Sequence, residues 1–191
     1  MNTELLIEIF GALTGIIYVV LEILKRRTMW VVGIVSSLVY VYVFAHAGFY
    51  AMAGLNLYYV AISVYGLWRW KISPDICHVS KRTALFCLLA TVLIFLLLTL
   101  LLGRFTNAPM PCADALITSM SVVATWMLSR SFLEQWWVWI VANLLAVCVY
   151  LWQGLYPTAL LYMAFSVAAV IGLKQWSAMN NDNLLSLPPK Q

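Results

Sequence analysis

The chain has 191 residues, of which 64% are hydrophobic and only 9% are charged. A soluble domain could not cover its surface with so few charges, and a mean hydropathy of +0.94 lies well outside the globular range. The net charge of +4 follows from the scarcity of acids, so it points to no nucleic-acid partner. We therefore expect an integral membrane protein without a separate soluble domain.

Seven apolar stretches follow one another along the chain, each near the roughly 20 residues that a helix needs to cross a bilayer. They cover residues 5–24, 28–46, 50–69, 83–103, 113–130, 133–152 and 156–175. We do not expect the first stretch to be a cleaved signal peptide, because Glu4 and Glu8 precede its apolar run and its basic cluster follows it. The composition thus predicts seven transmembrane helices.

The stretch from residue 48 to residue 70 returns once, without a gap, 106 positions further along the chain. This register pairs Trp30 with Trp136, Gly48 with Gly154, Gly66 with Gly172, and Trp70 with Trp176. Chance resemblance between aromatic helices is the alternative, but several matches in one register favour duplication. Two like-oriented triplets need an odd number of helices between them. We therefore predict an all-α membrane protein whose seven helices form a 3+1+3 parallel-repeat, SWEET-like arrangement, with a substrate site where the copies meet.

This arrangement divides the chain into four expected regions. They are a first three-helix repeat with its loop (1–82), a linker helix (83–112), a second three-helix repeat (113–176) and a disordered cytoplasmic tail (177–191). The tail is predicted to be disordered because it contains an Asn-Asn-Asp-Asn run and a Pro-Pro pair.

Ten of the eleven basic side chains lie at helix ends on one side of the predicted bundle. They are Lys25, Arg26, Arg27, Arg69, Lys71, Lys81, Arg82, Arg130, Lys174 and Lys190. The opposite side carries only Arg104. The positive-inside rule then places the amino terminus outside and the carboxyl terminus in the cytoplasm.

Polar groups inside the hydrocarbon are costly, so each is a candidate functional residue. Trp136, Trp139 and Asn143 are spaced three and four apart and share one helix face. Asn143 lies near mid-bilayer, and its repeat counterpart is Ser37. An aromatic face that ends in an amide suits a flat, polar, ring-containing solute. Alternatively, Trp136 and Trp137 belong to an interfacial belt and the Asn143 amide only joins helices.

Further polar candidates lie in the third and seventh stretches. Asn56, Tyr59 and Ser63 share a face, and Tyr162 is the repeat counterpart of Asn56. Such positions suit a passage lined from both halves. Hydrogen bonding between helices is an equal alternative.

Two acids lie within the predicted spans. Glu22 is three residues from Lys25, so it either contacts substrate or pairs with the basic cluster. Asp114 lies near the outer start of its helix, where it either attracts a cation or caps the helix. Acids together with aromatic rings make a cationic ring a suitable ligand. The four cysteines have no CxxC spacing and no histidine companions, so we expect neither a metal site nor a cofactor.

The ordered motifs along the chain resemble the PnuC family of bacterial vitamin transporters. They are the run from Glu134 to Asn143, the run from Tyr150 to Tyr162, Gly172 with Trp176, Ala47 to Tyr50, and Tyr65 to Trp70. The resemblance covers residues 5–176. It implies seven helices in a 3+1+3 pattern, a homotrimer in the bacterial inner membrane, and facilitated diffusion of an unphosphorylated vitamin that a cytoplasmic kinase then traps.

The same resemblance implies substrate contacts at Trp136, Trp139 and Asn143, and less directly at Asn56 and Tyr59. Branches of the family carry nicotinamide riboside, thiamine or riboflavin. Glu22 and the stretch from Tyr58 to Gly66 are more similar to the thiamine branch, so thiamine is the predicted cargo and nicotinamide riboside the alternative.

Two other functions are weighed against this uniporter. A membrane-embedded enzyme would need a clustered nucleophile, metal site or acid pair, and the sequence has no HExxH or GxSxG motif. A substrate-binding subunit of an ATP-driven importer would need a separate motor, because the chain has no ATP-binding motif. We therefore predict a transporter and no enzymatic activity.

Overall fold

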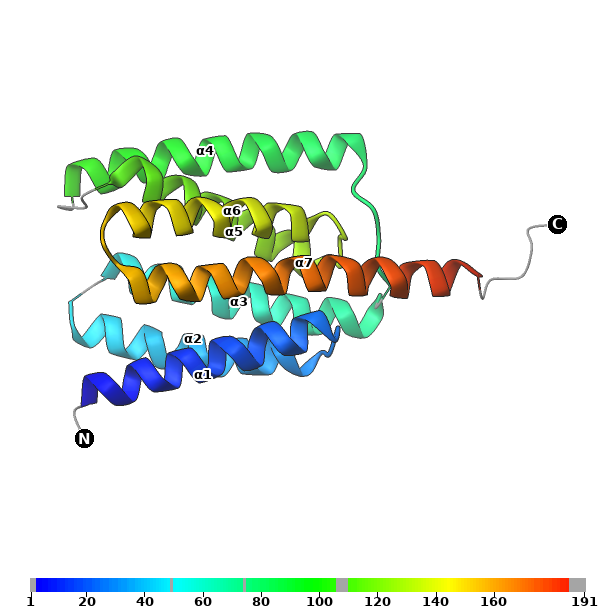
Figure 1. Cartoon of the computed structure of the whole chain (residues 1–191), viewed down its shortest axis with the longest axis horizontal. Coiled ribbons are helices and arrows are strands. Elements are labelled where there is room, and N and C mark those ends of the chain that lie inside the picture. The colour runs from blue at the N-terminus through cyan, green and yellow to red at the C-terminus, as the bar shows by residue number, and fades with distance from the viewer. Residues whose placement is uncertain (1–2, 49, 74, 106–109, 186–191) are drawn as a thin grey trace. The chain divides into compact units, whose positions relative to one another are not determined.

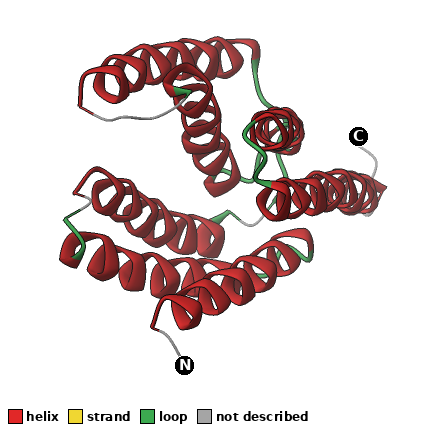
Figure 2. Ribbon diagram, turned by 60° about the vertical axis from the view of Figure 1, so that its left-hand side comes forward, coloured by secondary structure: helices red, strands yellow, loops and turns green. Residues whose placement is uncertain are grey.

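The computed structural model describes the backbone of residues 3–48, 50–73, 75–105 and 110–185, and the side chains of 10–11, 13–48, 52–73, 75–105 and 110–182. Within these residues the chain forms seven helices (Figure 1). They are α1 (Thr3–Ile23), α2 (Thr28–His46), α3 (Tyr50–Ile72), α4 (Lys81–Phe105), α5 (Pro111–Ser129), α6 (Gln135–Trp152) and α7 (Tyr156–Leu185). Figure 2 shows the same part of the chain as helices joined by short loops, with no strand drawn. The helices expected from the apolar stretches are thus confirmed.

Five of the described helices are long enough and apolar enough to cross a membrane: α2, α4, α5, α6, and α7 over Tyr156–Asp182. In α1 the described segment Leu13–Ile23 is also apolar. α3 is less apolar because Asn56, four tyrosines and two basic residues interrupt it. On α4, Cys87 is the one side chain classed as buried, and long leucine-rich runs are exposed, as expected for a helix that faces lipid.

The chain divides into two compact units, residues 1–75 and 76–191. The first unit ends short of the predicted boundary at residue 82, because the segment after Asp75 pairs with the second unit's α5–α6 turn. The backbone N–H of Cys77 donates to Ser131 O (3.0 Å), and Cys77 O accepts from Leu133 N (3.0 Å). The connector therefore belongs to the second unit.

The predicted linker helix is likewise part of the second unit. α4 packs against α5 through an apolar cluster that contains Cys87, Val123, Met127 and Phe132. The fourth helix thus contributes packing as well as changing the direction of the chain.

The prediction of disorder from residue 177 is wrong for the first part of that segment. α7 continues to Leu185 and extends past the end of α6 in Figure 1. The residues after Trp176 include Ala178 and Met179, which favour helix, and Asn180 makes a side-chain contact to the connector. Residues 186–191 of the predicted tail lie outside the described residues.

Both units end their helices in the same way, 106 residues apart. α1 and α5 end in a Schellman motif whose left-handed residue is not glycine: Lys25 has φ 51° and Ser131 has φ 57°. The matching bonds are Lys25 N to Glu22 O, Arg26 N to Leu21 O, Ser131 N to Leu128 O and Phe132 N to Met127 O. α2 and α6 are followed by Gly48 (φ +79°) and Gly154 (φ +74°), where a missing Cβ removes the steric penalty.

The same tryptophan–glycine contact also occurs in both units. In the first, the rings of Trp30 and Trp70 meet edge to face at 5.4 Å, and Trp30 lies directly on Gly66 of α3. In the second, Trp136 and Trp176 meet edge to face at 5.6 Å, and Trp136 lies on Gly172 of α7. Close approach of the helices at each glycine explains why the sequence match is gapless here.

Candidate functional site

The predicted polar residues of the first unit lie largely inside it. Glu22 is 4% exposed and Ser37 is 8% exposed. Asn56 turns its amide back onto its own helix, where Nδ2 donates to Met52 O (3.0 Å). This bond gives Asn56 a local role within α3, and its predicted substrate contact stays a prediction.

In the structure Glu22 lies near Tyr18, a residue that the sequence argument did not consider. Tyr18 lies one turn before Glu22 on α1, and it is an electrostatic neighbour of Glu22, Tyr58 and Tyr59. A Cβ added at Gly33 would lie 3.1 Å from Cε2 of Tyr18 and 3.0 Å from Oγ of Ser63. Three helices therefore meet at one buried group of polar side chains, which includes the predicted Glu22 and Tyr59. The i, i+4 spacing of Tyr18 and Glu22 was the available signal.

In the second unit, α6 directs Trp136, Trp139 and Asn143 inward. Trp136 is 2% exposed and Asn143 is 6% exposed, whereas the intervening Trp137 is 59% exposed. The indole Nε1 atoms of Trp136 and Trp139 are both buried and have no hydrogen-bond partner among the described residues. A buried N–H left unpaired costs about 1–3 kcal/mol, so these donors are suited to a polar ligand.

Asp114 and Tyr162 are brought close to the same third residue. The rings of Tyr150 and Tyr162 are 5.2 Å apart, a side-chain hydrogen bond joins them, and Asp114 is an electrostatic neighbour of Tyr150. α5, α6 and α7 each contribute one member of this group. The sequence argument missed Tyr150, whose partners are distant in sequence.

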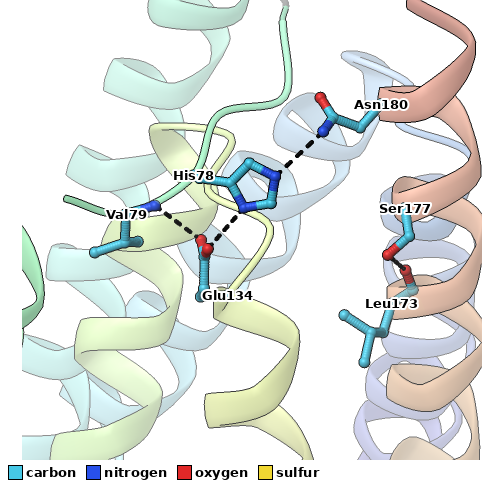
Figure 3. Close-up of polar contacts among 6 residues, drawn as sticks. All are labelled: His78, Val79, Glu134, Leu173, Ser177 and Asn180. Atoms are coloured by element: carbon cyan, nitrogen blue, oxygen red, sulfur yellow. Dashed lines mark hydrogen bonds and ion pairs between the residues drawn. The ribbon is translucent and has the colours of Figure 1, made fainter. Parts of the chain in front are cut away.

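A second polar group that the sequence argument missed lies on the connector. His78, to which no role was assigned, places Nδ1 2.9 Å from Oε1 of Glu134, while the Val79 N–H donates to the other carboxylate oxygen (3.0 Å). Nε2 of His78 lies 3.3 Å from Nδ2 of Asn180 on α7, and Figure 3 shows the imidazole between these two partners. These contacts hold the connector, the start of α6 and the end of α7 together. No group of three or more metal-ligating side chains occurs in the part of the chain that was described.

Comparison with known proteins identifies similar sequences along almost the whole chain. A family model described as "Nicotinamide mononucleotide transporter" matches residues 5–178. The nicotinamide riboside transporter PnuC of Escherichia coli (strain K12) is 20% identical over 201 residues, which cover 89% of this chain and 84% of that protein. PnuC of Neisseria mucosa is 24% identical over 186 residues, covering 88% of this chain and 71% of that protein.

A relative with a different named cargo is similar to the same degree. The riboflavin/roseoflavin transporter RibM of Streptomyces davaonensis is 21% identical over 178 residues, covering 88% of this chain and 83% of that protein. Among solved structures, the crystal structure of the vitamin B3 transporter PnuC matches with a TM-score of 0.73 and 22% identity, over 95% of this chain and 84% of that one. At this identity the structural match shows that the two chains share a fold.

Proposed function

The chain belongs to the nicotinamide mononucleotide transporter family, and from this premise we propose that it carries nicotinamide riboside across a bacterial cytoplasmic membrane by facilitated diffusion. Membership in this family confirms the resemblance from which we predicted a transporter. It also confirms the prediction that the chain is not an enzyme. The observation that carries the proposal is the inward face of α6. Two buried indole donors and a buried amide lie on a helix that is apolar enough to span a bilayer.

We assign the substrate contacts of α6 to Trp139 and Asn143. Trp136 packs on Gly172 and meets Trp176 edge to face, so its ring holds α6 against α7, and only its indole N–H remains for a ligand. Asn143 has two donors and an acceptor that match the carboxamide or ribose of a nucleoside. Tyr162 and Asp114, grouped around Tyr150, are proposed as further contacts. In the first unit the proposed contacts are Glu22, Ser37, Asn56 and Tyr59.

Nicotinamide riboside replaces thiamine as the preferred cargo. The relatives described above are named for nicotinamide riboside and for riboflavin, so their names give no support to the thiamine interpretation. Thiamine remains a useful competitor in the test below, because it shares a cationic aromatic ring with nicotinamide riboside. Riboflavin has a neutral ring system.

The proposed topology follows from the charges and from the repeated local geometry. We propose a 3+1+3 arrangement with α1–α3 and α5–α7 as repeats, because the helix ends and the tryptophan–glycine contacts recur at a constant interval of 106 residues. The basic helix ends then lie in the cytoplasm and the amino terminus lies outside. A homotrimer and trapping of the cargo by a cytoplasmic kinase are the corresponding proposals from the family resemblance.

The decisive experiment is a calorimetric titration of the purified chain with nicotinamide riboside, thiamine and riboflavin in parallel. We expect nicotinamide riboside to bind most tightly. Uptake of the radiolabelled vitamin into liposomes that contain only this protein then tests the transport step. Binding without uptake would favour a binding subunit of an ATP-driven importer, and binding of none of the three would contradict the proposed function.

A further inference from the structure

The first unit encloses a polar group that the packing of such a unit does not require. Tyr18 of α1 and Ser63 of α3 lie against Gly33 of α2, and Glu22 of α1 is an electrostatic neighbour of Tyr18. Ser63 is 3% exposed and Glu22 is 4% exposed. A carboxyl group inside a helical membrane unit is expensive, so its presence calls for an explanation beyond filling space.

The second unit shows that the same kind of helix pair forms without this group. At the positions 106 residues further on, it has Ala124 for Tyr18, Leu128 for Glu22, Trp139 for Gly33 and Ala169 for Ser63. Ala124, Leu128 and Ala169 are buried, and Trp139 is the one aromatic residue among these four positions, as Tyr18 is in the first unit. The tryptophan–glycine contact and the helix ends are nevertheless the same. The tryptophan–glycine contact and the helix ends therefore do not depend on the carboxyl and hydroxyl groups.

We propose that Glu22, with the hydroxyls of Tyr18 and Ser63, is a charge-selective element that recognises the positive ring of the cargo. This inference rests on the proposed function and adds to it the feature that separates cationic from neutral rings. A carboxylate among tyrosine rings offers a cation both a charge partner and aromatic faces.

A competing role for Glu22 is to hold the basic side chain of Lys25. Lys25 lies three residues further along the chain, and its Nζ is 4.6 Å from the centroid of the Trp70 ring. If Glu22 serves only to hold this basic side chain, neutralising either residue will lower the stability of the protein and leave its choice of cargo unchanged. The two roles therefore predict different results in one experiment.

The test compares nicotinamide riboside with its reduced dihydro form, which has nearly the same shape but no ring charge. Calorimetry on the purified full chain gives the dissociation constant of each compound for the unaltered protein, Glu22→Gln, Lys25→Gln and Asp182→Asn. The last variant is the matched control, because it also removes one carboxylate but lies on an exposed part of α7. Tyr18→Phe and Ser63→Ala are conservative variants of the same element.

We expect Glu22→Gln to weaken binding of the cationic form about tenfold, as for loss of one charge-assisted contact, and to change binding of the neutral form by less than about twofold. Tyr18→Phe and Ser63→Ala should each reduce the preference for the cation by about threefold, which keeps the inference testable if Glu22→Gln fails to fold. Equal losses for both compounds, or an unchanged preference in all three variants, would overturn the inference alone. If the unaltered protein binds neither compound, both the inference and the proposed function are wrong.

Discussion

The two units of the molecule share their tryptophan–glycine contacts and the turns that end their helices, and they differ in the polar side chains that they bury. Both place a tryptophan on a helix glycine, meet a second tryptophan edge to face, and turn their helices with left-handed residues at matching positions. The first unit encloses Glu22 beside Tyr18, whereas at the matching positions the second unit has Leu128 and Ala124. Close backbone approach and turn geometry tolerate few residue types, which explains why these positions match between the two units. The residues proposed to meet the cargo differ between the copies.

The largest expected effect comes from Asn143 of the second unit, whose counterpart in the first unit is Ser37. Asn143→Leu should abolish uptake into liposomes, because an isobutyl group of similar size removes every hydrogen bond that the amide can make. Its counterpart Ser37→Ala should retain more activity, since a hydroxyl provides fewer bonds than an amide. Undiminished uptake by Asn143→Leu, with normal thermal melting, would remove this residue from the proposed site.

The tryptophan–glycine contact should be equally important in both copies. A Cβ at Gly66 would lie 2.5 Å from Cζ2 of Trp30, and a Cβ at Gly172 would lie 2.5 Å from Cζ2 of Trp136. Gly66→Ala and Gly172→Ala should each destabilise the protein by about 1–3 kcal/mol, because the buried ring must move. Thermal melting in detergent measures this loss.

Gly54→Ala is the matched control for that prediction. Gly54 lies on α3 like Gly66, but nothing lies within 4 Å of a Cβ there. We expect this variant to be neutral or stabilised by about 0.5–1 kcal/mol. If Gly66→Ala melts at the same temperature as Gly54→Ala, the tryptophan does not constrain the helix.

A smaller loss is expected at the turns, where the constraint is conformational. Nothing lies within 4 Å of a Cβ at Gly48 or Gly154, yet both have positive φ. Alanine at either position should cost about 1–2 kcal/mol through the left-handed backbone alone. Melting temperatures of the two variants should fall by similar amounts, and a loss confined to one copy would show that the turns are not equivalent.

The smallest effect is expected for the connector, which has no counterpart in the first unit. His78→Ala removes an exposed ion pair and a contact to Asn180, and such exposed pairs contribute about 0.2–1 kcal/mol. Glu134→Gln should lose a similar amount, and the double variant should lose less than the sum if the two side chains act together. Strictly additive losses would mean that they are not coupled.

The helices and the register of the repeat could be predicted from local sequence. Apolar runs near the length of a span predicted helix bounds that differ from the observed ones by a few residues, except at the end of α7. There the asparagines suggested disorder, but the helix continues and Asn180 contacts the distant His78. The local composition does not reveal a side-chain partner that lies about a hundred residues away in the sequence.

The candidate residues were predicted in part. Asn143 and the tryptophans of α6 stood out because polar and aromatic groups are rare at their spacing in an apolar helix. Tyr18 and Tyr150 did not, since a tyrosine in a membrane helix is unremarkable until its neighbours are known. The importance of Tyr150 depends on Asp114 and Tyr162, which the packing of α5, α6 and α7 brings close to it, and that of Tyr18 depends on Glu22, one turn further along α1.

By itself, the sequence determined that this chain is a helical membrane protein built from a repeated pattern, because hydrophobic length and glycine–tryptophan spacing are local properties. Only the tertiary structure decided that the connector joins the second unit, that α7 runs on to Leu185, and that the carboxyl group of Glu22 is buried within the first unit. Those features arise where side chains far apart in the chain compete for the same space or satisfy each other's hydrogen bonds.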